Sequence, residues 1–190
     1  MASTRRIGSE TSATRATILK AALEVLQDQG GGHFTASAIA RRAGLKPHMV
    51  HYYFRTIDDL VLALVKMLGA TGLKNSARAI ASDNPLKALW DIEMGSKSSV
   101  AIMELGALAV HRDDIRAEMG RYIEQLRIVQ AEAVARYLEL RGVEPPIPPM
   151  SLTLVIAAIA RQLVREKDFG VSLGHAELTA AVEAMFAAKA

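Results

Sequence analysis

The sequence contains no cysteine, which excludes a disulfide scaffold, an iron–sulfur cluster and a zinc site built on thiolates. Aromatic residues make up only 5% of the chain. The longest uncharged stretch near the C-terminus, 145–160, is interrupted by prolines and is too short to span a bilayer. The first dozen residues are polar and lack the apolar segment of a signal peptide. We therefore expect no cofactor, no metal and no membrane contact.

What the chain does have is an apolar content of 51% over 190 residues, dominated by alanine and leucine. This content suffices for a sizeable helical core. The apolar spacing predicts an all-α fold of about nine helices, without internal repeats or strand patterns. The first expected helix starts after a cap at Thr14 or Ser12 and runs to about Gln29. The others cover 36–43, a short segment from Pro47, 56–81, 86–99, 100–110, 114–141, 150–167 and 174–188.

The most specific pattern lies in 34–60. Thr35 can cap a first short helix, because its hydroxyl can accept a hydrogen bond from a first-turn amide. Gly44 then supplies a left-handed turn residue. Pro47 can open the second helix, since a first-turn position has no use for the missing N–H. The pattern predicts two short helices joined by a tight turn.

The spacing within this pattern is that of a helix-turn-helix. Ala40 is small, Gly44 follows four residues later, and Val50 provides an apolar anchor six residues after that. A small residue is needed at Ala40 because the second helix crosses closely over it. Any helix pair with a glycine turn is the alternative interpretation of the spacing alone.

An aromatic cluster, HYYFR at 51–55, follows the motif directly, and Thr56 with Asp59 then starts a long helix in a near capping-box pattern. Across 14–64 this order resembles the DNA-binding domain of the tetracycline-repressor (TetR) family of transcriptional regulators. The chain departs from the family pattern at Ile57, where a phosphate-contacting lysine usually lies, and Arg55 is the alternative source of that charge.

The resemblance implies a three-helix DNA-binding domain followed by a larger helical domain that binds ligand and forms dimers. The corresponding ranges are a flexible arm at 1–12, the helix-turn-helix domain at 13–57, and the ligand-binding and dimerisation domain at 58–190. It also implies the bacterial cytoplasm, a homodimer on a palindromic operator, and repression released by a small effector. Coupling would run through the helix that starts at Thr56.

Positive charge is concentrated near the motif. Residues 1–57 carry eight Lys/Arg and three Asp/Glu, whereas 58–190 carry fifteen and seventeen. A polyanion such as double-stranded DNA is the partner that this distribution favours. Arg5 and Arg6 in the arm could enter a minor groove or have no role.

Residues on the outer face of the motif are the candidates for DNA contact. His48 can donate to a guanine edge, and Met49 or Pro47 can press against a thymine methyl. The remaining candidates suit phosphate or backbone contacts, and Ser37 and Arg41 could alternatively reach a base edge. They are Thr35, Ser37, Arg41, Lys46, His51, Tyr52 and Arg55. His48 and His51, with His33, could alternatively bind a metal, but no carboxylate or cysteine completes a ligand set.

Large, adaptable side chains beyond the motif could line a cavity for a mostly apolar effector, although each could equally be ordinary core. Glu104 stands out because it lies in the apolar segment AIMELGALAV, where a carboxylate needs a partner such as Arg112, His111 or a ligand donor. The full set is Trp90, Met94, Met103, Glu104, Met119, Tyr122, Gln125, Leu126 and Phe169.

The last two predicted helices carry more apolar surface than one partner face requires, which favours pairing with their copies in a second subunit over simple core packing. The residues concerned are Leu152, Val155, Ile156, Ile159, Leu163, Leu178, Val182 and Met185. No catalytic or phosphate-binding motif is present, so we expect no enzyme. A helical adaptor or a ligand-independent DNA-binding protein is the alternative.

Overall fold

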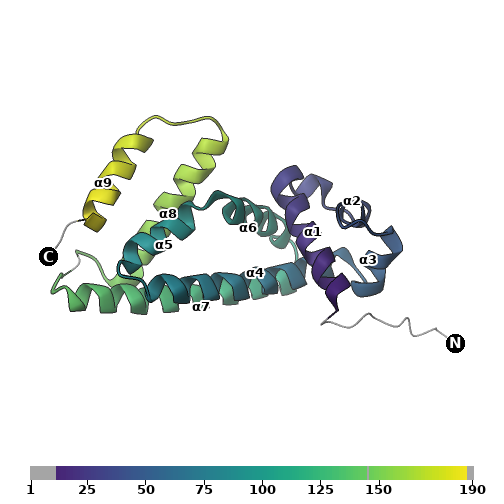
Figure 1. The fold of residues 1–190 in the computed structure, drawn as a ribbon, viewed down its shortest axis with the longest axis horizontal. Coiled ribbons are helices and arrows are strands. Elements are labelled where there is room, and N and C mark those ends of the chain that lie inside the picture. The colour runs from purple at the N-terminus through teal and green to yellow at the C-terminus, as the bar shows by residue number, and fades with distance from the viewer. Residues whose placement is uncertain (1–11, 145, 188–190) are drawn as a thin grey trace. The chain divides into compact units, whose positions relative to one another are not determined.

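The structure is a computed structural model that describes residues 12–144 and 146–187. Within these ranges the chain forms nine α-helices and a single 3₁₀ turn, with no strand (Figure 1). The predicted all-α fold class is confirmed. The predicted arm contacts of Arg5 and Arg6 lie outside the described residues. The elements are α1 (Ala13–Gln29), η1 (Gly31–His33), α2 (Ala36–Arg42), α3 (Pro47–Tyr53), α4 (Ile57–Ile80), α5 (Pro85–Met94), α6 (Ser96–Ala109), α7 (Asp113–Leu140), α8 (Pro149–Asp168) and α9 (His175–Ala187).

One predicted boundary is wrong. The sequence predicts one helix over 86–99 and a second over 100–110, but α5 ends at Met94 and α6 already begins at Ser96. The N–H of Gly95 bonds to the carbonyl of Ile92 and closes the last turn of α5. A glycine at this position ends the helix.

Side-chain caps set several helix starts. Ser12 accepts a hydrogen bond from the amide of Arg15 at 3.1 Å, so of the two predicted caps Ser12 is the one that starts the first helix. At α4, Thr56 and Asp59 exchange reciprocal hydrogen bonds, each 3.0 Å long, between side chain and backbone. Such a cap stabilises a helix by about 1 kcal/mol.

The chain divides into two compact units. The first unit consists of the chain up to Gly69 together with Val100–Arg121. The second unit consists of Ala70–Ser99 and the chain from Tyr122 onward. Both α4 and α7 therefore contribute residues to each unit. These units are defined by contacts, whereas the predicted domains are defined by function, so the predicted boundary at 57/58 stays a prediction.

The first unit has one continuous core. Helices α1 and α4 supply the largest shares of it, and α2, α3, α6 and α7 complete it. Ile18, Ile39, Leu64 and Ile115 are fully buried there. Burying a side chain of this size stabilises a fold by about 1.5–3 kcal/mol.

The second unit has two smaller cores. Ala79, Leu89, Val134 and Leu138 form one of them. The other consists of Trp90, Ala160, Leu163 and Phe186, with the Trp90 and Phe186 rings edge to face at 6.2 Å. Across the described residues, no helix is long and apolar enough to cross a bilayer.

Candidate nucleic-acid interface and effector site

The turn between α2 and α3 has the geometry that the spacing requires. Ala40 is fully buried, and Val50 is 1% exposed. Gly44 has φ +67°, the left-handed region that favours glycine. The N–H of Leu45 donates to the carbonyl of Ala40 at 2.8 Å, which fixes the corner. These contacts hold α3 in a defined position against α2.

Burial of one side of α3 turns its other side to solvent. Phe54 is 3% exposed and lies beneath the Arg15 guanidinium, whose carbon is 4.9 Å from the ring centroid. Tyr53 packs partly against the core and meets the Tyr52 ring edge to face at 5.1 Å. Among the DNA-contact candidates at 46–52, Met49 is half-buried. The other candidates in this range are exposed. They are Lys46, Pro47, His48, His51 and Tyr52.

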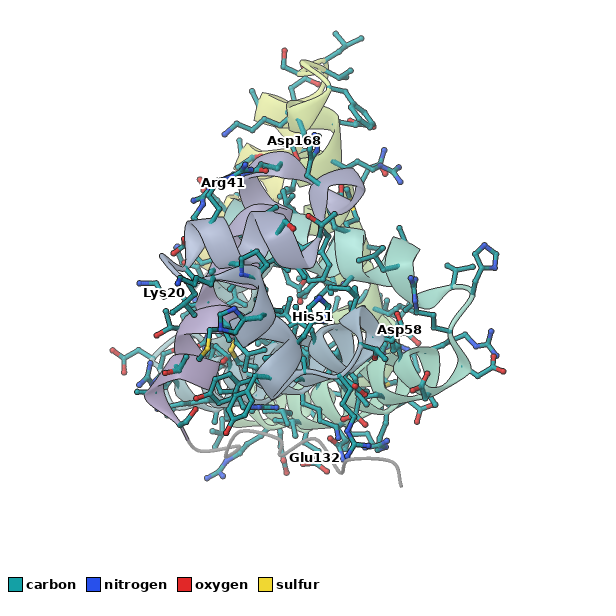
Figure 2. The ribbon with its side chains drawn as sticks, turned by 90° about the vertical axis from the view of Figure 1, so that its right-hand side faces the viewer. Lys20, Arg41, His51, Asp58, Glu132 and Asp168 are labelled. Carbon is teal, nitrogen blue, oxygen red and sulfur yellow. The ribbon has the colours of Figure 1, made fainter. Side chains whose placement is uncertain are left out.

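Helix α2 adds polar groups beside this face. Figure 2 views the ribbon from the side that carries α2 and α3, with Arg41 and His51 labelled. Ser37 and Arg41 are exposed, and exposed Thr35 accepts a hydrogen bond from the amide of Ala38 at 3.2 Å. Arg42, by contrast, pairs with Asp28 at 2.8 Å within the unit. Its charge is therefore partly neutralised.

A short exposed helix bearing a lysine, two imidazoles and a tyrosine hydroxyl suits the major groove of B-DNA. The arginines at 41 and 55 add charge for phosphates on either side of it. The structure thus brings the predicted DNA-contacting residues onto one unit, and their contacts with DNA stay predictions. Among the described residues, no group of three His, Cys, Asp or Glu could hold a metal ion.

Two contacts brace this unit from distant parts of the chain. Glu104 of α6 accepts a hydrogen bond from the amide of Gly31 at 2.7 Å. Arg112 pairs with Asp58 at the start of α4 at 2.7 Å. The apolar setting of Glu104 signalled a need for a partner, but sequence reasoning named Arg112, His111 or a ligand and missed the backbone amide.

The predicted effector-lining residues are not gathered in one place. Glu104 and the buried Met119 belong to the first unit, where Met119 packs in the core. Met103 is 49% exposed and Phe169 is 75% exposed. The remaining effector candidates belong to the second unit. Trp90 lies in one of its cores, Met94, Tyr122 and Leu126 are half-buried, and Gln125 is exposed.

Inside the second unit lies a polar cluster of which the sequence predicted only Tyr122 as a site residue. Burial raises the pKa of the Glu93 carboxyl, although the charge of Arg161 and a hydrogen bond with Gln130 oppose the shift. Burial, followed by the charge of Glu93, raises the pKa of the Tyr122 hydroxyl. Gln130 is 7% exposed and donates to Ser76 at 3.4 Å. We call these five residues the Glu93 cluster.

The second unit also contains a hollow of about 530 Å³ among α5, α8 and α9. His175 at its edge bonds to Glu166 at 2.7 Å, and this hydrogen bond lowers the pKa of the Glu166 carboxyl. Of the predicted effector residues, only Met94 lines the hollow within the described chain. The other lining residues are Leu163, Val164, Lys167, Asp168, His175, Ala176, Thr179, Ala180 and Glu183.

The predicted dimer residues differ in burial. Leu163 is 5% exposed and belongs to the core of its own chain. Leu152, Ile156, Ile159 and Val182 are partly buried against the cores of the second unit. Those that face solvent are Val155, Leu178 and Met185, together with Met150 and Leu154 nearby on α8.

Comparison with known proteins supports the interpretation of the N-terminal segment. The family described as "Bacterial regulatory proteins, tetR family" matches residues 18–64. The HTH-type transcriptional regulator BetI of Rhizobium meliloti (strain 1021) is 41% identical over 54 residues. That match covers 28% of this chain and 27% of BetI, so the chain matches only about a quarter of that relative's length.

Solved structures share the fold over nearly the whole chain at low identity. Reduced NemR of E. coli has a TM-score of 0.78 at 15% identity, covering 94% of this chain and 100% of NemR. A regulator from Saccharomonospora viridis in complex with choline has a TM-score of 0.70 at 16% identity, covering 80% and 83%. FadR from Bacillus subtilis in complex with stearoyl-CoA has a TM-score of 0.65 at 15% identity, covering 92% and 98%. Residues 18–64 of this chain therefore match the tetR family of bacterial regulatory proteins in sequence, and the chain shares the fold of the solved regulators beyond that segment.

Proposed function

We propose that the protein is a transcriptional repressor that binds a palindromic operator as a homodimer and is released by a small molecule. The observation that carries the proposal is the exposed face of α3, with Lys46, His48 and His51 outward while Val50 is 1% exposed beneath them. A helix with this division between buried and exposed sides can enter a major groove.

A binding measurement on DNA tests this proposal. Fluorescence anisotropy with duplexes from the DNA flanking the encoding gene should show saturable binding. The logarithm of Kd should rise linearly with the logarithm of the salt concentration. A scrambled duplex of equal length and composition is the control. Equal affinity for both duplexes at raised salt would leave only nonspecific charge attraction and would contradict the proposal.

Two variants separate the roles of the outer residues. We expect Lys46→Ala to weaken binding to all duplexes alike and to lower the salt slope by about 1. We expect His48→Ala to alter preference at one base pair, by about 1–3 kcal/mol of discrimination. Identical changes in specificity for both variants would contradict these assignments. Effector release is checked by adding candidate small molecules to the complex.

The homodimer is supported by exposed apolar side chains on the last two helices, which Figure 1 shows in green and yellow. Met185 of α9 is 73% exposed and Val155 of α8 is 43% exposed. In the loop between the helices, Phe169 and Leu173 are 75% and 94% exposed. Exposed apolar groups gathered on neighbouring elements are typical of an interface between subunits.

The effector would bind in the second unit. Proteins of this fold were crystallised with choline and with stearoyl-CoA. These complexes support a small-molecule site, and the two ligands differ in chemistry. Helices α4 and α7 supply residues to both units, so a shift of either helix on binding would reach the DNA-contacting unit. The effector shifts the equilibrium only by its difference in affinity for the two states.

A further inference from the structure

The first turn of α1 contributes an arginine to the unit that carries the helix-turn-helix. Arg15 is half-buried, and its guanidinium carbon lies 4.9 Å from the centroid of the Phe54 ring. Phe54 follows α3 directly and is only 3% exposed, so the core holds this ring in place. A cation over an aromatic face is attracted to it, and the guanidinium is therefore fixed beside the end of α3 (Figure 1).

This contact uses the flat face of the guanidinium and leaves its hydrogen-bond donors free. A guanidinium carries five N–H donors, all of which lie in its plane. Within the described part of the chain, the one hydrogen bond of Arg15 outside the helix ladder runs from its backbone amide to Ser12. The side chain itself therefore has no acceptor and no ion-pair partner there.

Other arginines of the same unit use their donors within the chain. Arg42 pairs with Asp28 at 2.8 Å, and Arg112 pairs with Asp58 at 2.7 Å. The first turn of α1, by contrast, contains no acidic residue that could neutralise Arg15. A positioned guanidinium with free donors suits an anionic acceptor from outside the chain, although covering the Phe54 ring is the alternative role.

The position of Arg15 indicates which anion this would be. Helix α3 has seven residues and is therefore about 10 Å long, while the major groove of B-DNA is about 12 Å wide. Groups at the ends of such a helix lie near the phosphates that border the groove. Lys46 stands at the first end of α3, and exposed Arg55 stands at the other, where Arg15 covers Phe54.

We propose that Arg15 binds a backbone phosphate of the DNA, with the Phe54 ring as the support that holds the guanidinium in place. Guanidinium and phosphate match in geometry, because two parallel N–H donors meet two phosphate oxygens. Such a contact carries no base preference and instead fixes the register of α3 in the groove. The inference rests on the proposed DNA-binding function and adds a contact that the sequence did not predict.

The salt dependence of DNA binding tests this contact. Fluorescence anisotropy of the full-length protein is measured over a series of salt concentrations, with the flanking duplex and with its scrambled control. We expect Arg15→Gln to weaken binding to both duplexes by the same factor, about tenfold. The slope of log Kd against log salt should fall by about 1 for each bound protomer. Arg15→Lys should keep the slope but bind more weakly than the wild type, because an ammonium cannot form the paired bonds.

A matched control comes from the same helix. Lys20→Gln removes the same charge from an exposed position of α1, about 140° around the helix from Arg15, and should change neither the affinity nor the slope. Phe54→Leu keeps an apolar side chain but removes the ring. It should weaken DNA binding of the wild type, yet add little in the Arg15→Gln background, because the ring acts through the guanidinium. Thermal unfolding checks that each variant is folded.

An affinity and slope of Arg15→Gln equal to those of the wild type would overturn the proposal and leave Arg15 as a cover for Phe54. Weaker binding with an unchanged slope would also overturn it, because α3 would then have moved without the loss of a phosphate contact.

The two duplexes separate this inference from the repressor function. Specific binding to the flanking duplex, with a slope that Arg15→Gln leaves unchanged, would overturn the contact and leave the function standing. Equal binding of the wild type to both duplexes, with a slope that Arg15→Gln lowers, would do the reverse. A wild type that binds neither duplex would overturn both.

Discussion

The two compact units bury their apolar residues differently. In the first unit one continuous core extends from α1 to α7, and its central side chains, such as Ile18 and Leu64, are fully buried. In the second unit the cores are small and separate, while large apolar side chains such as Met185 stay exposed. A unit that buries its own apolar surface needs no partner, whereas one that leaves such surface exposed is suited to an interface.

This difference fits the roles that we propose. A DNA-contacting unit must hold α3 rigidly, because contacts to base edges depend on the position of its backbone. A ligand-sensing unit must have two arrangements of similar free energy, and small, separate cores with a polar cluster permit this.

The largest effect should come from the core of the first unit. Leu64→Ala removes a fully buried side chain, so we expect the free energy of unfolding to fall by about 2–5 kcal/mol. Leu152→Ala, at a half-buried position of the second unit, is the matched reference and should lose less. Urea denaturation followed by circular dichroism measures both. An equal loss for the two variants would remove the contrast between the units.

A charge on the exposed apolar face should act on assembly rather than on folding. In a twofold interface Val155→Lys with Met185→Lys meets its own copy, so like charges oppose each other. We expect the dimer dissociation constant to rise about tenfold or more, equivalent to about 1.4 kcal/mol. Sedimentation velocity measures it. Leu140→Lys, at a residue that is 78% exposed at the end of α7, is the control and should leave the dimer intact.

The helix-turn-helix could be predicted from sequence because its determinants are local. Ala40, Gly44 and Val50 lie within eleven residues of one another, and the Thr56–Asp59 cap spans three. Each of these residues acts on its immediate neighbours, so spacing alone describes the geometry.

Other features depend on contacts that spacing does not encode. Gly31 and Glu104 are 73 positions apart, and only the fold brings the amide to the carboxylate. From the sequence alone, Glu93 is an ordinary polar residue between Asp91 and Lys97, but packing buries its side chain. The Glu93 cluster could therefore not be predicted from spacing, since its residues come from four helices.

Two helical glycines, one in each unit, differ in the space around them. A Cβ at Gly72 of α4 would overlap the Tyr122 hydroxyl in the second unit, whereas a Cβ at Gly120 of α7 meets nothing within 4 Å in the first. Gly120→Ala should stabilise by up to about 1 kcal/mol through helix propensity. Gly72→Ala should instead destabilise by about 1 kcal/mol, because overpacking outweighs that gain.

Thermal unfolding and a double-mutant cycle measure this pair. In the Tyr122→Phe background the hydroxyl is gone, so Gly72→Ala should lose most of its penalty. An unchanged penalty there would show that the close approach of Tyr122 is not its cause.

The smallest effect is a pH dependence confined to the second unit. Burial raises the pKa of Glu93 above its ordinary value of 4.5, so the folded protein holds this proton to a higher pH than the unfolded chain does. Its contribution to stability is therefore complete below that value and is lost as the pH rises through the raised pKa. Glu93→Gln keeps the neutral form at every pH. The difference in unfolding free energy between the variant and the wild type should consequently grow in favour of the variant from about pH 4 towards neutrality.

Glu166, whose lowered pKa acts in the opposite direction, is present in both proteins and cancels in the difference. Urea denaturation at a series of pH values measures it, with Glu132→Gln as the exposed control. A difference that stays flat, or that shrinks as the pH rises, would show that Arg161 and Gln130 compensate the carboxylate fully.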